Sequence, residues 1–169
     1  MKKLFAIIVT LLLLPIVNAQ QPTEDPGVTP DSFLWGLDRA LDQLTLLLTF
    51  DKGEKARKGL EIAQERLLEV KSMVEENKLE AAIKAKDEYG KTLVKVKQSV
   101  NEIEEDDSTE EIKKVIEIEK ELEDHDEEVE QTFGELKVKI EVKGEVTQQQ
   151  KDLIDSILNS LKGQTGEVE

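Results

Sequence analysis

The chain has 169 residues, 36% of them charged, and its 38 acidic against 23 basic residues give a formal net charge of −15, which disfavours binding to nucleic acid or to an anionic membrane surface. Cysteine is absent, so disulfides, thiolate metal sites and thiol nucleophiles are excluded. Aromatic residues make up only 4%, which predicts one domain with a core of aliphatic residues and alanine, the usual filling of helix bundles.

The N-terminus has the pattern of a secretory signal peptide. Lys2 and Lys3 precede an apolar run over residues 4–14, and Ala19 is a small residue at the expected cleavage position. The run is shorter than the roughly 20 apolar residues that a spanning helix needs, although an uncleaved anchor is an alternative. We therefore expect residues 1–19 to be removed and the mature chain to be secreted or extracytoplasmic, in the cell envelope, with no membrane insertion after cleavage.

A flexible, proline-rich tether over residues 20–31 is expected before the first helix, which the pattern predicts from Phe33 to Phe50 with Asp31 or Ser32 as its cap. Its leucines recur at alternating spacings of three and four, which places them on one helical face: Leu34, Leu37, Leu41, Leu44 and Leu48. Phe33, Ala40 and Leu47 widen this face beyond what a helix usually leaves in water. We expect this helix to be central and enclosed by the others.

Trp35 and Gly36 stand at the start of this helix. Trp35 is interpreted as a residue at the edge of the core, with a ligand platform as the alternative. For Gly36, which weakens a helix by about 1 kcal/mol relative to alanine, close helix packing beside Trp35 is the simplest explanation.

The second helix is predicted after a capping box formed by Asp51 and Glu54, and a turn near Asn77 separates it from the third. Its apolar residues form a heptad seam, as in coiled coils: Ala56, Leu60, Ala63, Leu67, Val70 and Val74. Short loops on both sides of this helix indicate antiparallel neighbours.

The third helix is predicted over residues 78–105, with an apolar face that consists of Ala82, Tyr89, Leu93, Val96, Val100 and Ile103. Lys86 occupies the one position of this face that should be apolar. A lysine there usually extends its ammonium group to the surface, which is the preferred interpretation over a functional role.

A second capping box, Ser108 with Glu111, begins the fourth helix. Its seam again alternates three and four: Val115, Ile118, Leu122, His125, Val129, Thr132 and Leu136. Between Glu102 and Glu135 there are 17 acids against three lysines, a local net charge of −14. Nearly all of the negative charge therefore belongs to this helix and the turn before it.

Residues 136–142 alternate apolar and charged side chains, which is strand periodicity. A lone strand would lack a partner in a helical chain, so we favour a continuation of the fourth helix that ends near Gly144. Thr147 with Gln150 caps a short last helix, which Gly163 should end.

The fold class is therefore all-α. After the signal peptide and the tether, we expect an antiparallel helical bundle over residues 32–162, with four main helices and a short C-terminal helix, followed by a disordered tail over residues 163–169.

A metal site is the clearest candidate for a ligand. Glu121, His125 and Glu128 are spaced four and three apart, so one face of the helix would present two carboxylates and an imidazole to a divalent cation. Acids are so dense here that some would fall beside any histidine, and His125 is in line with Leu122 and Val129. A partly buried structural histidine is the preferred interpretation.

Catalysis is not indicated. The single histidine has no serine near it in sequence, and six aromatic residues are too few to line a sugar-binding cleft. No cofactor is expected apart from a divalent cation at the candidate site. We expect a non-enzymatic binding or envelope interaction protein with an acidic surface, whose partner is a protein or a basic segment, and the alternative is a cation-binding protein that uses the acid-rich helix. The sequence leaves the oligomeric state open.

The stretch Thr29 to Phe50, followed by Asp51, Lys55, Ala56 and the run Ala63 to Glu69, resembles an uncharacterised family of exported bacterial and archaeal helical proteins known only as a domain of unknown function. Members of this family have a proline, a hydroxyl residue and an aromatic before a leucine-rich helix, then an Ala-x-x-Arg-Leu-x-Glu core. Ala63, Arg66, Leu67 and Glu69 keep that core, whereas Asp38 stands where a lysine is common and the fourth helix is unusually acidic. The resemblance covers residues 29–105 and implies an exported helical domain, with no activity or site residues.

Overall fold

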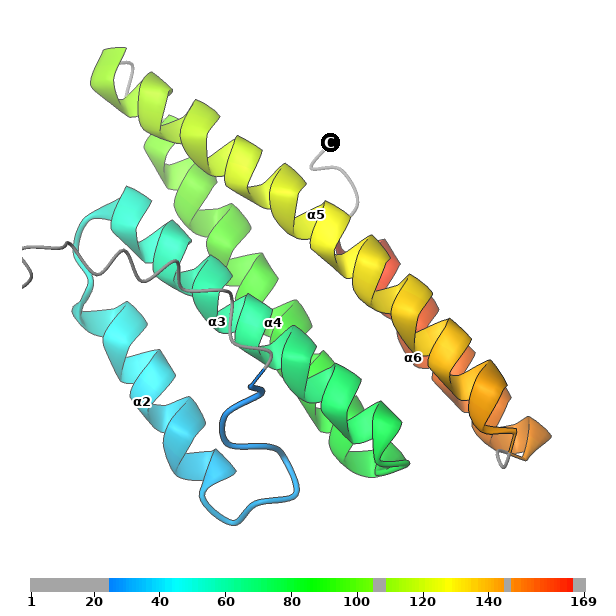
Figure 1. Ribbon diagram of the computed structural model, residues 1–169. Helices are drawn as coiled ribbons and strands as arrows, with labels where there is room; N and C mark the ends of the chain where they lie inside the picture. Colours follow the sequence, from blue (N-terminus) through cyan, green and yellow to red (C-terminus); the bar gives the residue numbers. More distant parts are fainter. Residues whose placement is uncertain (1–24, 105–108, 145–146, 166–169) are drawn as a thin grey trace, which may run out of the picture.

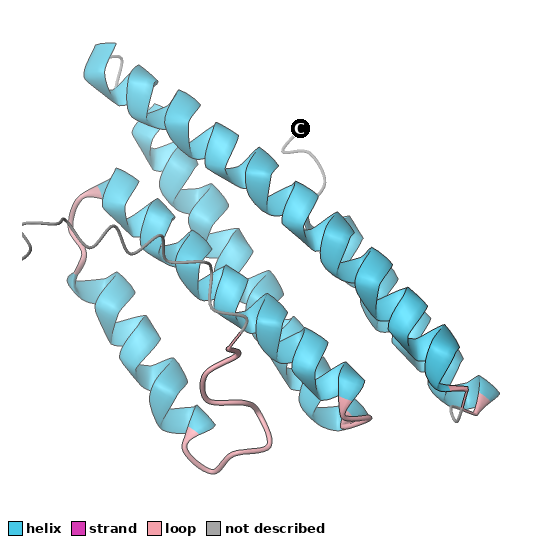
Figure 2. Ribbon diagram, viewed as in Figure 1, coloured by secondary structure: helices cyan, strands magenta, loops and turns pink. Residues whose placement is uncertain are grey.

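The computed structural model describes residues 25–104, 109–144 and 147–165, which form an all-α antiparallel bundle, as predicted (Figures 1 and 2). The expected signal peptide and Ser108 of the second capping box lie outside these residues. The helices are α2 (Trp35–Leu48), α3 (Lys52–Glu75), α4 (Leu79–Glu104), α5 (Thr109–Lys143) and α6 (Gln148–Thr165). No helix in the described part of the chain is both long and apolar enough to cross a membrane.

The α3–α4 pair is the centre of the bundle, because these two helices share the most extensive contact of any pair. Asn77 makes the tight turn between them with a φ of 59°, as its sequence position predicted. Gly59 allows their close approach, since a Cβ atom there would lie 2.7 Å from Cγ2 of Val96. Alanines along both helices keep the contact tight.

The long helix α5 lies along the α3–α4 pair, and α6 folds back beside the C-terminal half of α5 (Figure 1). One cluster of buried side chains joins α3, α4, α5 and α6, and a smaller one joins α3, α4 and the N-terminal part of α5. Leu122 packs against both clusters. The core is thus continuous along α5.

Most of the predicted local features are confirmed. All six seam residues of α3 are buried, and residues 136–142 are helical, with α5 ending at Lys143 before Gly144 at a φ of 62°. The Asp51 side chain accepts a hydrogen bond from the backbone N–H of Glu54 at 2.8 Å. Thr147 and Gln150 form their capping box at the start of α6, which continues two residues past its expected end at Gly163.

The prediction that the leucine-rich helix is central is wrong. Helix α2 lies at the edge of the bundle against α3 (Figure 1), and it begins at Trp35, two residues later than expected, with no side-chain cap. The five leucines of its predicted apolar face are exposed, with Leu37 at 60% and Leu41 at 55%, whereas Leu46 is buried. A Cβ atom on Gly36 would meet nothing within 4 Å, so close packing does not explain this glycine.

Two exposed ion pairs flank α2. Before the helix, the carboxylate of Asp31 accepts a hydrogen bond from the ammonium of Lys78 in the α3–α4 turn at 2.6 Å. After the helix, the carboxylate of Asp51 accepts a hydrogen bond from the ammonium of Lys114 on α5 at 3.2 Å. The segment that carries α2 is therefore connected to the rest of the bundle at both ends.

Candidate functional site

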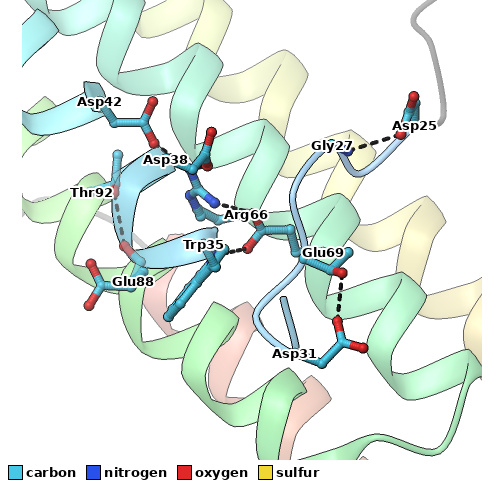
Figure 3. A network of polar contacts seen from close by, with 11 residues as sticks. Asp25, Gly27, Asp31, Trp35, Asp38, Asp42, Arg66, Glu69, Glu88 and Thr92 are labelled. Atoms are coloured by element: carbon cyan, nitrogen blue, oxygen red, sulfur yellow. Dashed lines mark hydrogen bonds and ion pairs between the residues drawn. The ribbon is translucent and has the colours of Figure 1, made fainter. Parts of the chain in front are cut away.

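The side of α2 that faces the bundle combines charged residues with the buried side chains of Trp35 and Leu46. Asp38 and Asp42 are four residues apart, so both carboxylates point the same way, toward the guanidinium of Arg66 on α3 (Figure 3). The Nη2 atom of Arg66 lies 2.8 Å from Asp38 and also contacts Asp42. Arg66 is only 1% exposed, and a buried guanidinium requires such partners.

Glu69 is the third carboxylate on this guanidinium. It lies one turn after Arg66 on α3, contacts the Nη1 atom, and is 1% exposed (Figure 3). The indole N–H of Trp35 donates a hydrogen bond to Glu69 at 3.1 Å. Burial raises the pKa of Glu69 to about 8, although Arg66 and Trp35 both oppose the rise. A single cation among three carboxylates favours keeping a proton on the most buried one.

Trp35 anchors the N-terminal end of α2. Its side chain is buried, and the guanidinium of Arg39 lies over the indole at 4.6 Å from the ring centroid. Arg39 also forms an ion pair with Glu88 of α4 at 2.7 Å. These contacts place Trp35 at the edge of the core, as predicted, and extend the attachment of α2 from α3 to α4.

This polar attachment leaves the opposite side of α2 in solvent. We call the set Leu34, Leu37, Leu41, Leu44 and Leu48 the leucine face; all five are exposed, between 44% and 60%. Phe33, Leu47 and Phe50 beside it are exposed further. Most of the large hydrophobic side chains exposed in the described parts of the chain lie between Phe33 and Phe50. Contiguous exposed apolar surface of this kind is typical of interaction sites.

The candidate metal residues take other partners. Glu121 accepts from Nε of Arg57 at 3.0 Å, and Glu128 accepts from the amide of Gln64 at 2.6 Å. His125 is 4% exposed, with Nε2 lying 3.1 Å from the hydroxyl of Tyr89 and Nδ1 3.7 Å from Glu128. Among the described residues, no three histidine or carboxylate side chains converge in a way that could hold a metal ion.

These three residues nevertheless line one pocket of about 400 Å³ between α3 and α5, with Glu61 and Asp124 beside them. A wider hollow of about 640 Å³ shares Glu61 and Glu128 and continues along the same two helices. Lys86, in contrast, is half-buried, and its ammonium lies 3.2 Å from the exposed carboxylate of Asp87, as expected for a lysine that extends to the surface.

The comparisons with known proteins identify the domain without assigning an activity. Residues 27–164 match a family described as Domain of unknown function (DUF5667). The chain belongs to this family. No curated protein and no solved structure matches it significantly.

The DUF5667 match begins before α2 and ends within α6, so the helix with the exposed leucines belongs to the domain as much as the core helices do. Arg66 and Glu69, two of the residues in the resemblance to an uncharacterised helical family, form hydrogen bonds with side chains of α2.

Reasoning from the sequence missed the ion network, although two signals were present. Asp38 and Asp42 lie outside the leucine face, four residues apart and therefore on one side of α2. On α3, a second stripe next to the heptad seam also alternates three and four and includes two charged residues: Gly59, Ile62, Arg66, Glu69 and Met73. A charged pair in a stripe that should be buried predicts a charged partner.

Proposed function

We propose that this DUF5667 protein is an exported, non-enzymatic binding protein of the cell envelope, and that the leucine face of α2 is its contact surface. The observation that carries this proposal is the orientation of α2, which turns its charged residues toward the bundle and the leucine face toward solvent. A helix that only covered a core would have the opposite orientation.

The ion network supports a specific orientation over a loosely attached helix. Asp38 and Asp42 reach one guanidinium on α3, and Arg39 reaches a carboxylate on α4. Rotating α2 to bury the leucines would remove these partners from Arg66, which is itself buried. The orientation therefore holds the leucines outward before any partner arrives, so binding incurs little ordering cost.

Crosslinking in the cell envelope tests this proposal. We expect a photo-reactive residue placed at Leu37 to capture envelope proteins, and we expect the double variant L41S/L44S to capture fewer. A photo-reactive residue at Val94, an exposed apolar position on α4, is the control for nonspecific capture. Equal capture from both positions would contradict the proposal.

A divalent-cation binder is the second candidate, because Glu61, Glu121, Asp124, His125 and Glu128 line one pocket. Binding would require Glu121 to leave Arg57. Calorimetric titration of the protein with calcium, zinc and copper tests this candidate, with H125Q as the matched variant. No heat and no change in melting temperature would rule it out.

A further inference from the structure

We propose that the leucine face of α2 packs against the leucine face of a second copy of this chain, so that the protein is a two-fold symmetric dimer. This inference rests on the proposed function, because it names the occupant of the same surface.

The first argument is the distribution of charge. The chain is 36% charged with a net charge of −15, yet every exposed residue from Phe33 to Phe50 is uncharged. The three charged residues in this stretch, Asp38, Arg39 and Asp42, are half-buried in ion pairs with α3 and α4. Two strongly acidic molecules repel each other least where the facing surfaces carry no charge. The leucine face itself meets that condition.

The second argument is self-complementarity. Leucines at alternating spacings of three and four form a seam whose side chains fit between those of another such seam. A symmetric dimer needs one patch that matches itself, and a leucine seam on a single helix does so without any second surface. Leu41 is the middle member of the five, so it faces its own equivalent whether the two helices run parallel or antiparallel.

The third argument concerns size. Helix α2 has 14 residues and is therefore about 21 Å long, with Phe33 and Phe50 extending the apolar surface at both ends. That surface is at the low end for a specific interface, which buries roughly 800 Å² per partner. We therefore expect reversible association that dissociates on dilution, rather than an obligate dimer.

A membrane surface fits less well. The acid-rich helix α5 belongs to the same molecule, and anionic lipid headgroups would repel it. The apolar residues 4–14 of this chain are another occupant to test. Both alternatives become outcomes of the experiment below.

Sedimentation equilibrium measures the molecular mass of the protein in solution. We would compare the full chain in detergent with the chain that begins at Gln20, which retains all five described helices. We expect the chain from Gln20 to dimerise reversibly, and we expect L41S/L44S to weaken the dimer at least about tenfold. V94S removes an exposed apolar side chain from α4 and should leave the dimer unchanged. Circular dichroism establishes that each variant is folded.

A cysteine variant provides an independent readout, because the natural chain has no cysteine. L41C should form a disulfide-linked dimer under mild oxidation, whereas V94C should stay monomeric. A monomer at all concentrations, or equal crosslinking of L41C and V94C, overturns the proposal. Two further results would overturn it. The first is a protein that stays monomeric and binds phosphatidylcholine vesicles through α2. The second is a full chain in which residues 4–14 protect Leu41 and no dimer forms.

The two proposals can fail separately. If the protein is monomeric and its L41S/L44S variant still captures fewer envelope proteins, the dimer proposal is wrong and the proposed binding function stands. A dimer that captures no envelope protein would support the second copy and reject an envelope partner at this surface.

Discussion

Helices α2 and α3 both carry apolar residues at alternating spacings of three and four. On α3 the face that these residues form is buried, whereas on α2 it is exposed. On α3, Leu67 and Val70 of the seam are 1% and 0% exposed, whereas Leu37 and Leu41 on α2 are mostly in solvent. The seam of α3 alternates with alanines, so α4 can approach it closely. The inner side of α2 instead carries carboxylates that a buried guanidinium requires. Apolar periodicity thus shows which residues share a face, and charge complementarity decides which face turns inward.

Among the changes proposed here, removing Arg66 should lower the free energy of unfolding the most. R66L removes the cation that all three carboxylates contact and detaches Asp38 and Asp42 from α3, so we expect a loss of about 3–5 kcal/mol in the free energy of unfolding by urea. R57L is the matched control on the same helix, because Arg57 pairs at the surface and should cost about 1 kcal/mol or less. Similar losses for the two variants would show that the network does not hold α2.

Truncating one leucine on each helix tests the burial difference directly. L67A should cost about 2–5 kcal/mol, since it opens a cavity in the core, whereas L41A should change the free energy of unfolding by no more than about 0.5 kcal/mol. Both are measured by urea unfolding at a low protein concentration, where a dimer would dissociate. A large loss of unfolding free energy for L41A under these conditions would indicate that α2 is central in the bundle, as the sequence pattern predicts.

Glycines on the two helices should respond in opposite directions. G59A places a methyl group against Val96, which is buried, so we expect a loss of about 1–3 kcal/mol. G36A meets open space on α2 and should gain up to about 1 kcal/mol from helix propensity. Thermal unfolding followed by circular dichroism measures both. A stabilised G59A would mean that α3 and α4 separate more easily than their contact indicates.

The pH dependence of the free energy of unfolding should reveal the titration of the Glu69 carboxyl group. Its pKa is raised in the folded state, so its contribution is fully present below the unfolded value of 4.5 and is lost as the pH rises through about 8. Because α2 is at the edge and can loosen to hydrate the carboxylate, we expect a fall of about 1–2 kcal/mol between pH 5 and pH 9. E69Q should flatten the curve over this range. An identical slope in wild type and E69Q would place the titration elsewhere.

Local signals predicted the bundle well because they act within one helix or turn. Asn77, the Asp51 cap, the seam of α3 and the continuation of α5 through residues 136–142 each depend on neighbours in sequence. The position of α2 depends instead on Arg66, 24 residues beyond Asp42, and such pairings carry no period that a single sequence reveals.

The candidate site was hidden for the same reason. Five leucines on one face of a helix are equally consistent with a core helix and with a contact surface, so the pattern alone favoured the commoner case. Only the contacts of Asp38, Asp42 and Trp35 with α3 distinguish the two. His125 shows the opposite situation, since its place in line with Leu122 and Val129 was enough to predict a partly buried structural histidine, and the side chain is buried.

The ion pair between Asp31 and Lys78 has a mechanical consequence. Tension applied on the N-terminal side of Asp31 would first load this exposed pair, which joins the chain to the α3–α4 turn through Lys78, and would load α2 once the pair breaks. A pulling force would therefore separate the leucine-bearing helix at low load and leave the α3–α4 hairpin folded.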